Sequence, residues 1–176
     1  MPKTGYFSEH PFTLSADFLL GSTRDFNLGA GLSFSYCYMV GPVACLQMGG
    51  GIDYTEGFGP YSKPADASES FYEKGIHPYA QLGMNIFPSH HWGLGLWSGA
   101  GYSHFWGKLP QTPSDGSSGD YSKGGFMWKL GATFLVRIND YTGFHFDLGL
   151  KTLPSLLEKE DRHWGVETRA GFNLSF

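Results

Sequence analysis

Apolar and polar residues alternate along eight separate stretches of the chain. In VETRAGFNLSF, the last of them, Val166, Ala170, Phe172, Leu174 and Phe176 fall on one face of an extended chain, and charged, small or amide residues fall on the other. Because successive side chains of a β-strand point to opposite faces, this period of two predicts strands with one apolar face. The predicted strands cover residues 12–20, 26–38, 44–55, 76–86, 92–106, 125–138, 143–152 and 163–176.

The links between these strands alternate in length. Links such as 39–43 and 87–91 are short, whereas 55–75 and 107–124 are long, polar and rich in Gly, Ser and Pro. Short links at one end and long links at the other are typical of an up-and-down antiparallel barrel in a membrane. Pairing of the first strand with the last would remove both exposed sheet edges. The sequence therefore predicts one all-β domain over residues 1–176, a closed eight-stranded antiparallel up-and-down β-barrel.

The alternative is a soluble barrel of the lipocalin type, with its apolar face turned inward. The apolar faces carry most of the 15 Phe, 5 Trp and 10 Tyr residues, while the other faces consist largely of Gly, Ser, Thr and a few charged groups. The interior of an eight-stranded barrel is only just wide enough to be filled by side chains. The aromatic residues would not fit inside it, so we expect the apolar face to point outward into lipid.

The charged residues of the polar strand faces are balanced in sign. A confined lumen must pair its charges because an unpaired buried ion is very costly, whereas a wet surface would show such a balance only by chance. We therefore expect an ion-pair network that plugs the lumen and is not a selectivity filter. Its predicted members are Asp17, Asp53, Lys129, Arg137, Asp147, Lys151, Glu167 and Arg169.

Aromatic residues gather near the strand ends on the apolar face, with Leu, Ala and Met between them. Amphipathic rings at two levels form the girdles of a bilayer-spanning surface. The predicted girdle residues are Tyr38, Tyr54, Trp92, Trp106, Phe126, Trp128, Phe144 and Trp164.

Composition narrows the classes of function. Charged residues make up 16% of the chain and the net charge is −4, against about 25% charged residues in a typical soluble domain. No basic run is present, so we expect no nucleic-acid partner.

The first residues, MPKTGYFSEHP, lack the apolar core of a signal peptide, so an exported protein would have lost its leader. His90 and His91 cannot point the same way along an extended chain, and we expect neither a metal site nor a cofactor.

The alternating last strand with its terminal aromatic residue resembles the C-terminal signature of bacterial outer-membrane β-barrel proteins. The matching residues are Phe172, Leu174 and Phe176. The chain as a whole resembles the eight-stranded members, namely the OmpA transmembrane domain, OmpX and Ail, and the opacity proteins. This resemblance implies recognition of the last strand by the barrel assembly machinery, contact with outer-membrane lipids and lipopolysaccharide, and periplasmic termini and short turns, with the long links extracellular.

Two cysteines flank the predicted turn at 38–44. If Tyr36 pairs with Leu46, Cys37 falls opposite Cys45 and both face inward. Cross-strand neighbours are close enough to be bridged with adjustment, and the periplasm is oxidising. A disulfide and two free thiols that fill the lumen both remain open.

An enzymatic function is the alternative to a binding function. The lipid A deacylase PagL resembles this chain in strand number and uses a His and a Ser two residues apart on its outward face. In YSHFWG, His104 is a weak catalytic candidate that faces outward, but Trp106 stands two residues on and Ser103 points inward. A general base without a nucleophile within reach does not make a hydrolytic site.

The long links are the remaining place for function, because rigid scaffolds hold binding residues in their loops. The favoured hypothesis is a non-enzymatic outer-membrane barrel whose extracellular links bind a surface ligand or an envelope partner. A lipid A-modifying enzyme and a small passive channel are the alternatives.

Overall fold

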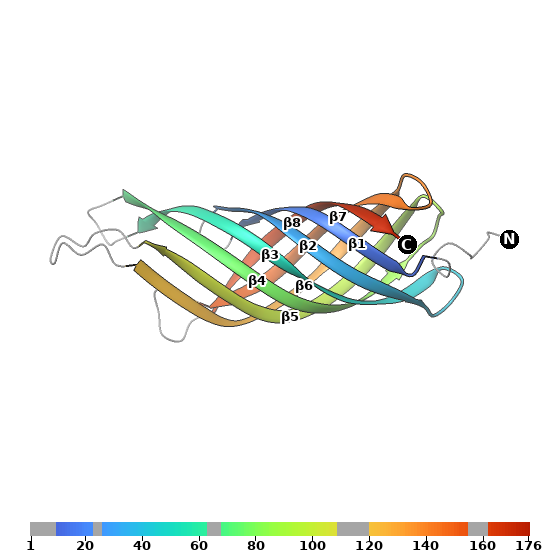
Figure 1. The fold of residues 1–176 in the computed structure, drawn as a ribbon, viewed down its shortest axis with the longest axis horizontal. Coiled ribbons are helices and arrows are strands. Elements are labelled where there is room, and N and C mark those ends of the chain that lie inside the picture. The colour runs from blue at the N-terminus through green and yellow to red at the C-terminus, as the bar shows by residue number, and fades with distance from the viewer. Residues whose placement is uncertain (1–9, 23–25, 63–67, 109–119, 155–161) are drawn as a thin grey trace.

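The computed structural model describes residues 10–22, 26–62, 68–108, 120–154 and 162–176. Eight antiparallel strands follow one another around a closed barrel in the order of the sequence (Figure 1). Each strand is hydrogen-bonded to the strand before it and the strand after it, and the first is hydrogen-bonded to the last. This confirms the predicted fold class. The strands are β1 Phe12–Ser22, β2 Phe26–Met39, β3 Ala44–Ser62, β4 Ser68–Ile86, β5 Trp92–Lys108, β6 Asp120–Arg137, β7 Thr142–Pro154 and β8 Arg162–Ser175.

Strands β1 and β8 close the barrel. Their ladder pairs Leu14 with Leu174 and Asp17 with Gly171, and beyond it Phe12 and Phe176 exchange backbone hydrogen bonds of 3.2 and 3.0 Å. The C-terminus therefore lies at the same end as the three short turns (Figure 1). We call this the turn end, and the opposite end, from which β3–β6 project, the loop end.

Strands β3–β6 are longer than the sequence pattern predicts. The ladders continue through both long links, pairing Glu56 with Lys74 on β3–β4 and Gly107 with Tyr121 on β5–β6. Strand pairing satisfies backbone groups that an irregular loop would leave to water or side chains. The parts of the predicted links that do not belong to strands, residues 63–67 and 109–119, lie outside the described residues.

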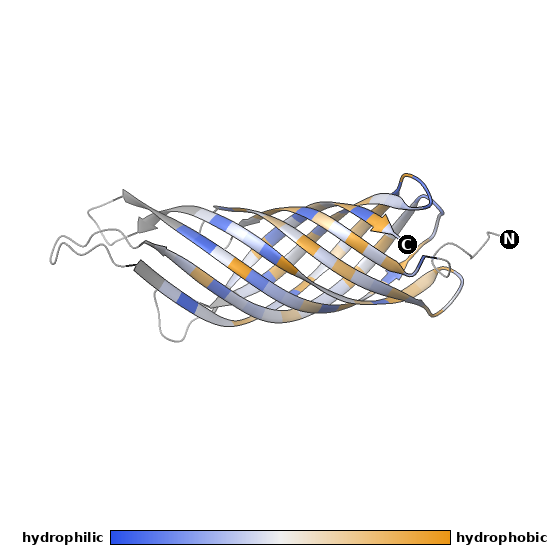
Figure 2. Cartoon of the chain, viewed as in Figure 1, coloured by the Kyte–Doolittle hydropathy of each residue, from blue (hydrophilic) through white to orange (hydrophobic). Residues whose placement is uncertain are grey.

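The outer wall is apolar. Hydropathy alternates along the strands (Figure 2), and outward-facing residues such as Leu96 and Leu148 are 67% and 61% exposed. Two outward hydroxyls are satisfied by the backbone: Ser98 donates to the Lys129 carbonyl at 3.3 Å and Thr168 to the Leu20 carbonyl at 3.1 Å. This arrangement suits lipid, in which unsatisfied polar groups are costly. It also removes the lipocalin-like alternative, whose apolar face would point inward.

Among the described residues, no helix is long and apolar enough to cross a membrane.

Candidate functional site

The centre of the lumen holds a compact cluster of ion pairs built around Arg169. One terminal nitrogen of its guanidinium donates to Asp17 Oδ2 at 2.8 Å and to the Tyr79 hydroxyl at 2.7 Å. The other donates to Asp53 Oδ2 at 2.8 Å and to Glu167 Oε1 at 3.2 Å. The planar fork of donors on Arg suits several acceptors at once. Arg169 thereby joins three carboxylates from β1, β3 and β8.

Two lysines complete this lumen cluster. Lys129 Nζ lies 2.7 Å from Asp53 Oδ2 and 3.2 Å from Glu167 Oε1, and Lys151 Nζ lies 2.7 Å from Glu167 Oε2. The Lys129 ammonium also sits 4.1 Å from the centre of the Tyr79 ring. All these charged groups are buried, so each charge is held by opposite charges and not by bulk water.

The structure brings seven of the eight predicted network residues to this cluster and its rim. Asp147 lies at the rim: it accepts a hydrogen bond from Thr133 at 2.6 Å and is 3.9 Å from Arg169 Nε. Arg137 lies outside the cluster, contrary to the expectation. It is opposite Gly143, next to the β6–β7 turn, and eight residues beyond Lys129 along a strand correspond to roughly 26 Å.

Two glycines make room for the carboxylates of Asp17 and Asp53. A Cβ on Gly171 would collide with Asp17 Oδ1 and with the imidazole of His145. A Cβ on Gly31 would come within 2.6 Å of Asp53 Oδ1. Gly31 and Gly171 stand opposite Asp17 on its two neighbouring strands. Because neither carries a side chain, the acidic groups can converge.

A set of aromatic and apolar residues lies beside the lumen cluster, and we call the two together the lumen seal. Sequence reasoning missed this second part. Tyr79, Phe105 and Met127 form a buried cluster, and the His77 ring lies 4.9 Å from the Phe105 ring while its Nε2 is 2.8 Å from Thr55 Oγ1. These residues occupy the polar, inward-facing positions of their strands, where the alternation pattern leads one to expect small or polar groups. A large inward residue among inward glycines was the available signal.

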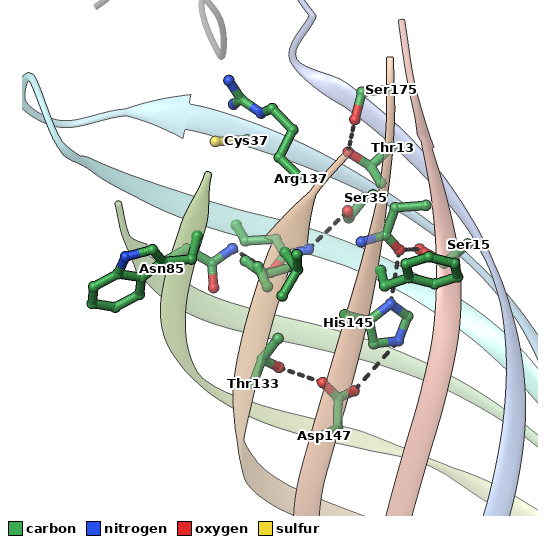
Figure 3. A pocket seen from close by; sticks show the side chains of 18 of the residues that line it. Thr13, Ser15, Ser35, Cys37, Asn85, Thr133, Arg137, His145, Asp147 and Ser175 are labelled. Carbon is green, nitrogen blue, oxygen red and sulfur yellow. Dashed lines mark hydrogen bonds and ion pairs between the residues drawn. The ribbon is translucent and has the colours of Figure 1, made fainter. Parts of the chain in front are cut away.

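A polar cavity opens from the ion-pair cluster around Arg169 toward the turn end (Figure 3). On its floor, His145 Nε2 lies 3.3 Å from Asp17 Oδ1, and His145 Nδ1 lies 2.8 Å from Asn173 Oδ1. Asn173 also accepts from Ser15 at 2.7 Å, and Arg137 lines the wall of the cavity. Within the described part of the chain, no group of His, Cys, Asp and Glu side chains is arranged to hold a metal ion.

The structure joins Cys37 and Cys45 by a disulfide, with a Cα–Cα distance of 5.7 Å. The predicted register is nevertheless wrong by two residues: Tyr36 pairs with Met48, and Cys37 stands opposite Gln47. The turn is the cause, because the Val40 N–H donates to the Ala44 carbonyl at 3.0 Å and fixes the ladder there. The bridge therefore runs diagonally between strands.

The predicted girdle residues all lie on the outer wall. Tyr38, Trp92 and Phe144 lie close to the short turns, and the others lie toward the loop end, where the Trp128 and Trp164 rings are 5.9 Å apart. On the last strand, Phe172, Leu174 and Phe176 also face outward. Phe176 stacks on Phe12 at 6.1 Å.

His104 has a partner that sequence spacing could not reveal. Its Nε2 lies 3.3 Å from the hydroxyl of Ser122, which is outward-facing on the adjacent strand β6. Ser103 points into the lumen and is fully buried, as expected. The neighbour arises from strand pairing, since Ser122 stands opposite Trp106, two residues from His104.

No protein-family model and no curated protein matches the sequence. Among solved structures, Neisserial surface protein A is similar at 13% identity, with a TM-score of 0.66 and coverage of 94% of this chain and 97% of that one. A major outer membrane protein from Thermus thermophilus is similar at 14% identity, with a TM-score of 0.60 and coverage of 95% and 100%. The outer membrane enzyme PagL is similar at 13% identity, with a TM-score of 0.54 and coverage of 93% and 99%. At these identities the likeness shows the fold, and the chain has the barrel fold of bacterial outer-membrane proteins.

Proposed function

We propose that this protein is an integral barrel of the bacterial outer membrane that binds a surface ligand or an envelope partner at its loop end. The observation that carries the proposal is the projection of β3–β6 beyond the ends of β1, β2, β7 and β8 (Figure 1). The Glu56–Lys74 ion pair, at 3.7 Å, joins β3 and β4 on the outer wall near the loop end. Strand β3 then continues to Ser62, and six further residues extend it by about 20 Å.

The projection of β3–β6 also supports an orientation of the barrel in the membrane. Both termini and the turn end would face the periplasm, and the loop end would face the outside. Outer-membrane lipids and lipopolysaccharide would contact the aromatic girdles, and the assembly machinery would read Phe172, Leu174 and Phe176 during biogenesis. The apolar outer wall and the aromatic last strand support these partners.

A passive channel is less well supported, because the lumen cluster fills the middle of the barrel. Lys129 and Asp53, which face each other across the lumen, are each only 2% exposed. A lipid A-modifying enzyme remains the other alternative, and it depends on the His104 region of the outer wall.

Shortening the projection tests the binding function. Residues 59–71 and 108–120 would be replaced by tight turns, and a photo-crosslinking amino acid would be placed at position 62 of the otherwise native chain. We expect crosslinks to an envelope or surface component on intact cells from the native barrel. We also expect loss of the associated phenotype in the shortened barrel, whose fold would be verified by a heat-modifiability gel. Unchanged phenotype in a folded, shortened barrel would refute the proposal.

A further inference from the structure

A polar pair stands on the outer wall near the loop end. Ser122 Oγ and His104 Nε2 lie 3.3 Å apart on neighbouring strands, where His104 is opposite Gly124 and Ser122 is opposite Trp106. Ser122 is exposed and His104 is half-buried. Both groups are therefore open to a molecule that lies against the outside of the barrel.

This serine differs from Ser98 and Thr168, two other outward hydroxyls of the wall. Ser98 and Thr168 each donate to a backbone carbonyl, which ties the hydroxyl into the sheet. Ser122 instead meets an imidazole nitrogen. When that nitrogen accepts, the pair has the arrangement in which a neighbouring base activates a hydroxyl as a nucleophile.

The space beside the pair is shaped by Gly124 and Tyr102. A Cβ on Gly124 would lie 2.7 Å from Cζ and 2.8 Å from Cε1 of the Tyr102 ring. The Tyr102 side chain therefore crosses from β5 to β6, and its phenol end lies on the strand that carries Ser122. A phenol hydroxyl can donate to the oxyanion that forms during acyl transfer. On the other side, the Trp106 ring lies 5.8 Å from the His104 ring.

We propose that Ser122 and His104 form a hydrolytic site for the ester-linked acyl chains of membrane lipids. Ser122 Oγ attacks the ester carbonyl while His104 Nε2 takes the hydroxyl proton, and Tyr102 donates to the carbonyl oxygen. The ester C–O bond then breaks, the leaving alkoxide receives the proton from His104, and an acyl–Ser122 remains. Water, deprotonated by His104, attacks this ester and releases the fatty acid, which restores the serine.

The substrate class follows from the position of the pair. The apolar wall runs from here toward the turn end, with Phe126 and Trp128 next along β6. Lys74 on β4, which stands opposite Trp106, and its partner Glu56 on β3 mark a polar level of the wall. The ester groups of lipids lie at this same boundary between hydrocarbon and headgroup. The inference uses the membrane placement of the proposed function but not its loop-end binding.

The first experiment is site-specific labelling of the refolded barrel in detergent with a fluorophosphonate, read by peptide mass spectrometry. We expect an adduct on Ser122, none on Ser98, and a loss of at least tenfold in the labelling rate for His104→Gln. Ser122→Ala should abolish the adduct in a protein that still shifts on a heat-modifiability gel. An unlabelled Ser122 in the folded native barrel, or equal labelling of Ser98, would overturn the proposal.

The second experiment reconstitutes the barrel into vesicles of ester-linked phospholipid and, in parallel, of lipopolysaccharide. We expect release of free fatty acid by the native protein and by Ser98→Ala but not by Ser122→Ala, and slower release by Tyr102→Phe. A Ser122 adduct in detergent without fatty-acid release from either vesicle would overturn the assigned substrate class. Neither result bears on the crosslinking at position 62. The hydrolytic function and the loop-end binding function can therefore each be refuted without the other.

Discussion

Lys129 and Asp53 are 76 residues apart in the sequence, and Lys129 Nζ lies 2.7 Å from Asp53 Oδ2 across the lumen. Their strands, β6 and β3, are not neighbours in the sheet. This contact therefore ties opposite walls of the barrel together, in addition to the hydrogen bonds between adjacent strands. Arg169 does the same from β8, since it contacts Asp53 as well.

Breaking this pair from one side should strongly destabilise the barrel. Lys129→Met and Asp53→Asn would each leave an unbalanced charge in the buried cluster, although Asp53 keeps Arg169 and Lys129 keeps Glu167. The loss for an unpaired buried charge is about 3–5 kcal/mol, and we expect each variant to approach this range. The double variant should lose less than the sum of the two, because it removes both charges together. Urea unfolding in lipid vesicles would measure the free energies. Additive losses would show that the pair is not coupled.

The exposed pair Lys74–Glu56 provides the matched control. Its atoms are 3.7 Å apart and its side chains are 38% and 35% exposed, so water and salt screen the interaction. We expect Lys74→Met to change the unfolding free energy by at most about 1 kcal/mol. A loss as large as that of Lys129→Met would mean that burial does not explain the difference.

The disulfide should stabilise the barrel modestly. It closes a short segment, with a sequence separation of 8, and the chain-entropy relation gives about 2–3 kcal/mol for such a loop. Cys37→Ser with Cys45→Ser should therefore lower the unfolding free energy by that order, and reductant should leave this variant unchanged. Reductant should act slowly on the native protein, since Cys45 is fully buried. Equal unfolding curves for the two proteins would contradict the expected contribution.

A charge on the outer wall should be costly according to its depth. Leu148 lies mid-strand on β7 with its side chain outward, whereas Ile138 is outward at the β6–β7 turn. We expect Leu148→Arg to lower the free energy of unfolding in vesicles by about 2–4 kcal/mol and Ile138→Arg by about 0–1 kcal/mol. Similar losses at both positions would argue against a bilayer around this wall.

The alternation of side chains was sufficient to predict the barrel and its inside-out faces, because a period of two specifies a face directly. It could not determine register: a shift of two residues leaves every face unchanged, so the pairing of Tyr36 with Met48 was not visible in the pattern. Contacts that depend on register or on tilt were missed for the same reason. Ser122 beside His104 is one such contact, and the convergence of His145 on Asp17 is another. Arg137 was wrongly assigned to the ion-pair network, because alternation shows which face of the sheet a residue occupies but not its position along the barrel axis.

Tyr79 joins both parts of the lumen seal, because it belongs to the buried cluster with Phe105 and Met127 and its hydroxyl accepts from Arg169 at 2.7 Å. We therefore expect no discrete conductance in planar bilayers from the native barrel or from Tyr79→Phe, which keeps the ring. Tyr79→Ala removes the ring between the apolar and charged parts, and the space should fill with water that is continuous with the polar cavity of the turn end. Discrete conductance steps should then appear, in protein whose gel mobility still shows a folded barrel. Conductance in the native protein would mean that the cluster is not a seal, and a silent, folded Tyr79→Ala barrel would mean that the ion pairs alone close the lumen.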